Sequence, residues 1–112
     1  MRIALPLVGG KLSVHFGHCE EFAFVDVDRQ RKVIEKVECL PAPAHQPGLL
    51  PQWLFEKGAD MVIAGGMGRR AQDLFSGQKI RVLVGAPSET PEAVVNAYLN
   101  GSLETGENIC DH

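Results

Sequence analysis

Histidine and cysteine side chains are concentrated in two short segments of this sequence. The chain has four His and three Cys, and five of them stand between residues 15 and 19 or in the last three positions. Imidazole nitrogen and thiolate sulfur bind Zn, Cu, Fe and metal-sulfide units, whereas Ca and Mg prefer oxygen ligands. The sequence therefore predicts a metal site formed by His15, His18, Cys19, Cys110 and His112.

A glycine-rich segment is the second candidate binding site. It consists of Gly65, Gly66, Met67, Gly68, Arg69 and Arg70, and residues 66–71 fit G-x-G-x-x-A between a strand and a helix. A dinucleotide site is disfavoured because the next strand ends in Ala86-Pro87-Ser88, without the acidic residue that binds ribose. Backbone amides, a helix N-terminus and two guanidinium groups attract anions. We therefore expect an anion here, for which a metal-sulfide cluster qualifies.

Three strands are expected to precede the first helix. The apolar run 3–8 ends at Gly9-Gly10 and predicts a buried central strand. Residues 21–28 and 32–39 alternate in polarity on either side of a polar turn, which predicts a hairpin. The proline-rich segment 40–48 then predicts a loop.

Strands and helices alternate in the second half of the chain. The apolar spacing predicts a helix from residue 49 to Lys57, a strand over 60–65, and a helix buried through Ala71, Leu74 and Phe75. A buried strand over 79–85 follows, and Thr90 predicts the N-cap of a third helix. The order β-β-β-α-β-α-β-α predicts an α/β fold with a mixed five-stranded sheet and helices on its faces, as in ribonuclease-H-like folds.

Composition limits the classes of function. The 112 residues, 45% of them hydrophobic, predict one domain spanning 1–112. A net charge of -3, without a basic cluster, argues against nucleic acid and anionic membranes, and no apolar run approaches a membrane span of about 20 residues. The first strand holds no acid for a two-metal nuclease. Three widely spaced Cys fit a reducing compartment, so we expect a cytoplasmic protein.

Several of these segments together resemble a known family. They are His15-Phe16-Gly17 and the residues 22–28, 58–68, 80–86 and 97–103. In combination they closely resemble the dinitrogenase iron-molybdenum cofactor biosynthesis family, which includes small nitrogenase cofactor carriers and the orange protein with its molybdenum-copper sulfide cluster. The resemblance covers nearly the whole chain.

The resemblance implies a ribonuclease-H-like, non-enzymatic protein that binds, carries or inserts a metal-sulfur cluster of the Fe-Mo-S or Mo-Cu-S type. It also implies partner proteins that donate and accept the cluster. The family histidine before Phe-Gly falls on His15, and the family glycine loop falls on residues 65–68. The chain departs from the commonest family pattern at His18-Cys19, where Arg-Ala is frequent, and at Arg69-Arg70.

These departures leave a second function open. Additional nitrogen and sulfur ligands also suit a single Zn, Cu or Fe ion in a sensor or regulatory protein. Cys19 fits either a ligand or a small buried residue, and Cys110 and His112 fit either ligands or a chain end without a role. Cys39 is expected to be structural and His45 exposed. A homodimer is expected if each copy offers half of a ligand set.

Overall fold

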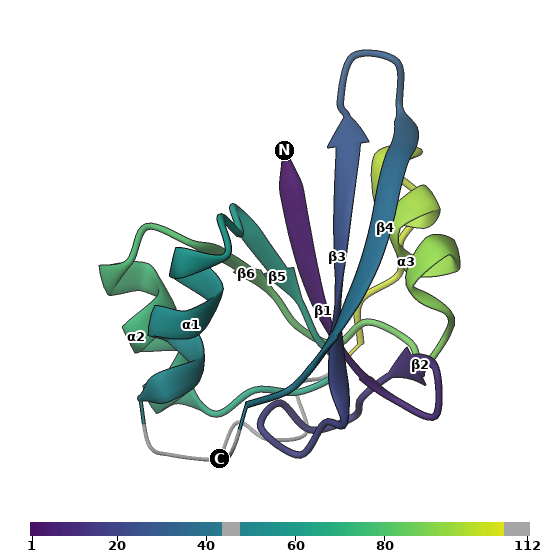
Figure 1. Cartoon of the computed structure of the whole chain (residues 1–112). Coiled ribbons are helices and arrows are strands. Elements are labelled where there is room, and N and C mark those ends of the chain that lie inside the picture. The colour runs from purple at the N-terminus through teal and green to yellow at the C-terminus, as the bar shows by residue number, and fades with distance from the viewer. Residues whose placement is uncertain (44–47, 107–112) are drawn as a thin grey trace.

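A mixed β-sheet with helices on both faces forms the body of the molecule (Figure 1). The computed structural model describes residues 1–43 and 48–106, and six strands form one sheet in these residues. Five of them lie in the order β4-β3-β1-β5-β6, and β2 pairs with β1 outside this path. The strands are β1 (Arg2–Val8), β2 (Lys11–Leu12), β3 (Glu21–Asp28), β4 (Val33–Pro41), β5 (Met61–Ile63) and β6 (Arg81–Leu83).

Strand direction divides the sheet into two parts. β1, β5 and β6 run parallel to one another, whereas β2 and β3 are antiparallel to β1, and β4 is antiparallel to β3. The chain therefore leaves β1 and β5 at the same end of the sheet, where the carboxyl ends of these strands lie. The two candidate binding segments begin at this end.

Three helices cover the sheet. Figure 1 shows α1 (Leu49–Glu56) and α2 (Arg69–Gly77) on one face and α3 (Pro91–Leu99) on the other. Alternation along β1 supplies both cores: Ile3 and Leu5 pack on the α3 side, and Ala4 packs on the side of α1 and α2. In the described residues, no helix has the length and apolar character needed to cross a membrane.

The predicted α/β class, the mixed sheet and the helices on both faces are confirmed, but the strand count of five is wrong. The sixth strand is β2, which pairs Leu12 with Leu7 and Lys11 with Val8. Gly9 and Gly10, both with positive φ, form the tight turn between β1 and β2. Two residues are too few to show alternation, so the sequence marked only the end of β1.

Two burial predictions are also wrong. Leu74 is 42% exposed, and Phe75 rather than Leu74 carries the buried face of α2. The strand predicted as buried over 79–85 is the short β6, in which Arg81 is exposed because β6 lies at the edge of the sheet. Periodicity predicted the helix and the strand correctly, but it could not show which other elements pack against them and bury their side chains.

Arg2 connects β1 to three other segments at the end of the sheet where β1 begins. Its Nε donates to Asp26 Oδ1 over 2.9 Å, and its Nη1 donates to the Lys57 carbonyl at the end of α1 over 2.7 Å. The Arg2 backbone amide donates to the carboxylate of Asp60 over 2.9 Å. The hydrogen bond from Arg2 lowers the pKa of Asp26 below its usual value. Ionised Asp26 therefore favours the folded state.

Asp26→Asn tests this pairing. At pH 7 we expect the free energy of unfolding to fall by less than about 1 kcal/mol, because both side chains are partly exposed. Since the pKa of Asp26 is lowered by folding, its contribution is fully present above the unfolded value of about 3.9 and is lost as the pH falls through the folded value. Urea unfolding at pH 7 and pH 3 measures this change.

Asp73→Asn, on the exposed surface of α2, is the matched control and should behave like the parent protein at pH 7. A difference between Asp26→Asn and the parent that stayed constant from pH 7 to pH 3 would contradict the assignment.

Candidate functional site

A serine fixes the loop that carries the two predicted histidine ligands. Ser13 is buried, and its Oγ donates to the His15 carbonyl over 2.8 Å and accepts from the His15 amide over 3.3 Å. The His18 amide donates to the same His15 carbonyl over 3.3 Å. The loop therefore turns tightly between the two histidines, and both remain exposed.

Phe16 anchors this loop to the core on the side of α1 and α2. Its ring meets Phe22 and Phe75 edge to face, with centroid distances of 6.0 and 5.4 Å. Its backbone amide donates to the Gly66 carbonyl over 2.8 Å. Because Phe16 points inward, the histidines on either side of it are held at the surface.

The backbone of the histidine loop touches the predicted glycine segment directly. The Gly65 amide donates to the Ser13 carbonyl over 3.2 Å. A Cβ atom on Gly65 would lie 2.8 Å from that carbonyl oxygen and 3.0 Å from the Cα of Val14. Only glycine allows this approach, so the two candidate segments are in contact through their backbones.

The two imidazoles lie side by side. Their centroids are 6.3 Å apart and their planes meet at 82°. Two rings bound to one ion would have centroids about 5 Å apart, given metal–nitrogen distances of about 2 Å, which is somewhat closer than the observed separation. Both histidines also line a pocket of about 280 Å³ together with Val8, Leu12, Ser13, Val14 and Ser88. His15 and His18 thus bring two imidazoles to the lining of one partly apolar pocket.

Cys19 is less well suited to bind a metal. It is partly buried and packs against the core on the side of α1 and α2. Burial raises the pKa of the Cys19 thiol, so a metal would have to displace its proton. Within residues 1–43 and 48–106, no three His, Cys, Asp or Glu side chains are grouped closely enough to hold a metal ion.

The other soft donors of the sequence prediction, Cys110 and His112, lie outside the described residues, as does His45. The last described residue, Gly106, is hydrogen-bonded to the segment that follows β6. The Gly106 amide donates to the Gly85 carbonyl over 2.7 Å, and the Gly85 amide donates to the Gly65 carbonyl over 2.8 Å. The backbone of Gly85 thus bridges Gly106 and Gly65, with one hydrogen bond to each of them.

The remaining residues of the glycine segment differ in what they offer a ligand. Met67 is buried, and its carbonyl accepts a hydrogen bond from Gln72 over 2.9 Å. Gly68 is the N-cap of α2 and provides no side-chain cap. Arg69 and Arg70 are exposed in the first turn of α2. The positive charge is thus concentrated at the start of α2, where the helix dipole also favours an anion.

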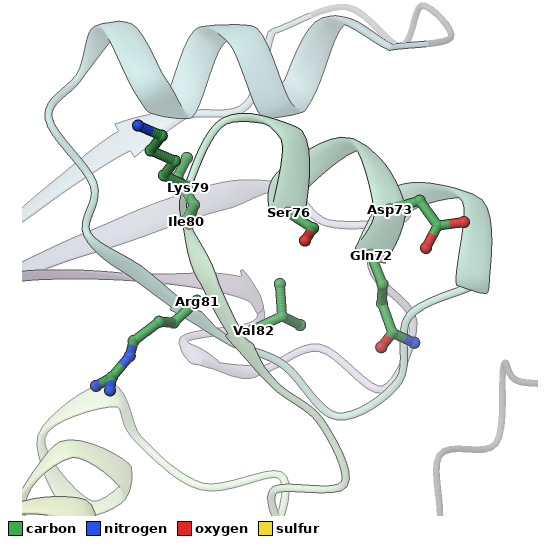
Figure 2. A pocket seen from close by; sticks show the side chains of 7 residues that line it. All are labelled: Gln72, Asp73, Ser76, Lys79, Ile80, Arg81 and Val82. Atoms are coloured by element: carbon green, nitrogen blue, oxygen red, sulfur yellow. The ribbon is translucent and has the colours of Figure 1, made fainter.

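A larger groove of about 490 Å³ lies elsewhere, between α2 and β6 (Figure 2). It is lined by Gln72, Asp73, Ser76, Lys79, Ile80, Arg81 and Val82. In Figure 2, Lys79 and Arg81 extend away from Ser76 and Gln72. This mixed-charge groove gathers no set of nitrogen or sulfur donors, so the histidine loop is the better candidate for binding a metal.

Sequence reasoning assigned no structural role to three residues that shape the site. Ser13 fixes the histidine turn, Phe16 anchors it, and Ser88 lines the pocket while its Oγ donates to the Leu12 carbonyl over 2.9 Å. A serine two residues before a histidine is a recognisable turn signal. The partners of Phe16 and Ser88 are distant in the sequence and left no such signal.

Comparison with known proteins gives a family match over most of the chain. The dinitrogenase iron-molybdenum cofactor family matches residues 1–101. The uncharacterized protein MJ0580 of Methanocaldococcus jannaschii is 29% identical, with 96% of this chain and 92% of that protein covered. The family resemblance seen in the sequence is thereby confirmed.

Two solved structures share the fold. The crystal structure of PH0822 has a TM-score of 0.86 and 31% identity, and 94% of each chain is covered. The apo form of the orange protein from Desulfovibrio gigas has a TM-score of 0.71 and 21% identity, with 96% of this chain and 93% of that chain covered. The second likeness concerns the fold alone.

Gly65→Ser tests the contact between the two loops. The new Cβ would press against Ser13 and Val14, so we expect the free energy of unfolding to fall by about 1–3 kcal/mol. Urea unfolding gives the energy, and amide NMR shifts of residues 13–18 report the displaced loop. Gly68→Ser is the matched control: its Cβ meets no atom within 4 Å, and serine is a favourable N-cap. Equal effects of the two substitutions would refute the contact.

Proposed function

Since the chain belongs to the dinitrogenase iron-molybdenum cofactor family, we propose that it binds a metal-sulfur cluster as cargo and carries or inserts it without catalysing a reaction. Membership associates the chain with iron-molybdenum cofactor biosynthesis or cluster binding in general. The carrier role, the cluster type and the ligands are our proposal. The whole of residues 1–112 would act as one cluster-binding domain.

One observation carries the proposal: two exposed imidazoles are held on a loop whose backbone is hydrogen-bonded to the glycine segment. His15 and His18 supply nitrogen donors, and the loop contacts Gly65 and Gly66. Soft or borderline metals suit these donors. An anionic sulfide shell would be attracted by the positive start of α2, which lies on the same segment.

Each predicted residue has a proposed role. His15 and His18 bind metal directly, and Cys110 and His112 complete the ligand set from the C-terminal segment, which is entered from Gly106 beside Gly85. Cys19 contributes only if the metal displaces its proton. Gly65 permits the close approach, and the segment Gly66, Met67, Gly68, Arg69 and Arg70 neighbours the anionic part of the cluster.

The proposed cargo is a cluster of the Fe-Mo-S or Mo-Cu-S type. Exposed ligands favour transfer, because a partner protein can reach the metal without unfolding the carrier. The proposed partners are therefore proteins that donate and accept clusters in the cytoplasm, and a homodimer would shield an exposed site. We also retain the ribonuclease-H-like assignment, which is supported by the sheet order β4-β3-β1-β5-β6.

A mononuclear Zn, Cu or Fe sensor is the second candidate function. It is favoured by the neighbouring imidazoles of His15 and His18, which suit one ion as well as a cluster. The two functions differ in whether the protein binds acid-labile sulfide together with the metal. About one metal per chain without acid-labile sulfide would favour the sensor, whereas sulfide bound together with metal would favour the carrier.

Anaerobic reconstitution tests the carrier. We expect the protein treated with tetrathiomolybdate and copper, or with iron and sulfide, to retain a coloured species with a charge-transfer band after desalting. His15→Ala should weaken cluster binding by about tenfold or more, because it removes a proposed ligand. Absorbance titration together with metal and sulfide analysis measures the binding.

Gln30→Ala, in the turn between β3 and β4, is the control and should bind like the parent protein. If the folded protein retains no coloured species from either mixture, the carrier proposal is wrong. If His15→Ala binds as tightly as the parent, the ligand assignment is wrong.

A double substitution, Cys110→Ala with His112→Ala, tests the proposed role of the C-terminal donors. We expect weaker cluster retention and an altered charge-transfer spectrum, because a thiolate and an imidazole would be lost from the ligand set. Unchanged spectra and retention would assign the whole metal site to the histidine loop.

A further inference from the structure

The outer edge of β4 is the longest exposed strand edge in the described residues. β4 has nine residues and is the last strand on its side of the sheet, whereas β6 at the opposite edge has three. Figure 1 shows β4 running along the outside of the β3–β4 hairpin. An edge strand presents amide and carbonyl groups that can pair with another strand.

The direction of these groups follows from the antiparallel ladder. The Ala42 amide donates to the Glu20 carbonyl over 3.1 Å, so Ala42 faces β3. Residues of an antiparallel strand alternate in the neighbour to which they bond. Leu40 and Glu38 therefore also face β3. Cys39 lies between these two residues and Val37 precedes Glu38. Both direct their amide and carbonyl groups away from β3, toward the open edge.

Two oppositely charged side chains flank Val37 in the sequence of β4. Lys36 and Glu38 are on one face of the sheet, opposite Asp26 and Phe24 of β3. They are exposed to 63% and 47%, and their charged groups are 3.9 Å apart. Val37 is on the other face and is 38% exposed. One positive and one negative side chain thus flank an exposed apolar residue.

We propose that the β4 edge binds a second copy of this chain in antiparallel fashion, with a two-fold axis at Val37. In this register Val37 lies opposite Val37 of the second copy, and Lys36 lies opposite Glu38 of the second copy. The two-fold symmetry generates each oppositely charged pair twice. The outward amide of Val37 then donates to the Val37 carbonyl of the second copy, the reverse hydrogen bond forms as well, and the two sheets become continuous.

Charge symmetry identifies the second copy as the occupant. A two-fold pairing sets Lys36 and Glu38 opposite the complementary charges of the same sequence, whereas an unrelated strand would have to carry the reverse order of charges. The bulge in β4, between its pairings with Asp26 and Val27, lies beyond Lys36 and leaves the pairing around Val37 regular. The interaction goes beyond the proposed cluster binding and requires no metal.

Sedimentation equilibrium of the full chain over a concentration series, in a metal-free buffer, tests the pairing. We expect a dimer. Lys36→Glu and Glu38→Lys should each raise the dissociation constant by about tenfold or more, because each places like charges opposite one another. The double variant Lys36→Glu with Glu38→Lys should restore dimerisation, and an equimolar mixture of the two single variants should form heterodimers.

Lys79→Glu, next to the opposite edge of the sheet, makes the same charge change and should leave the dissociation constant unchanged. Val37→Pro supplies an independent test: it removes an outward amide without breaking a β3–β4 hydrogen bond, so the monomer should fold and the dimer should be lost. Circular dichroism verifies the fold of each variant.

Three results would overturn the proposal. One is a parent protein that remains monomeric up to about 1 mM, a concentration at which even weak association is detectable. Another is a dimer that Val37→Pro leaves intact. The last is a double charge variant that dimerises no better than the single variants.

Discussion

The close approach of two backbones, at Gly65 and at Ser13–Val14, is the constraint on which the candidate site depends. No side chain fits between them, and the hydrogen bonds from Gly65 to Ser13 and from Phe16 to Gly66 join the two loops. The histidine loop follows β1 and the short β2, and the glycine segment follows β5. Both lie at the carboxyl ends of the parallel strands β1 and β5. Ligand sites in α/β sheets commonly form at such ends. The fold thus brings the imidazoles to a segment 50 residues later in the chain.

Elements with a local signal could be predicted from the sequence. Thr90, Pro91 and Asn100 mark the beginning and end of α3, and Thr90 Oγ1 accepts from the Ala93 amide over 3.3 Å. Alternation along β3 and β4 predicted their hairpin. The two-residue β2 could not be recognised, because its identity as a strand depends on pairing with β1. The exposure of Leu74 likewise depends on neighbours that periodicity does not reveal.

The sequence indicated the candidate donor residues, but the geometry of the loops that carry them could not be predicted from it. The sequence has His15 and His18 in one short segment, and the structure has them side by side. The glycines of residues 65–68 also carried a signal. Their contact with Ser13 did not, since it depends on how the parallel sheet aligns two distant loops. The inward direction of Phe16 depends equally on Phe75, which α2 supplies from across the core.

The two ends of the parallel strands differ in the interactions that they make. Arg2, at the beginning of β1, bonds to Asp26 of β3 and to the end of α1, and this end of the sheet is closed by charge pairing. The opposite end carries exposed histidines and a backbone contact instead. The backbone hydrogen bonds of Gly65 and Phe16, the Ser13 hydroxyl and the buried Phe16 ring hold the loop in place. A loop that is held by several contacts of this kind gives the proposed carrier a scaffold that can remain folded while a ligand is bound and released.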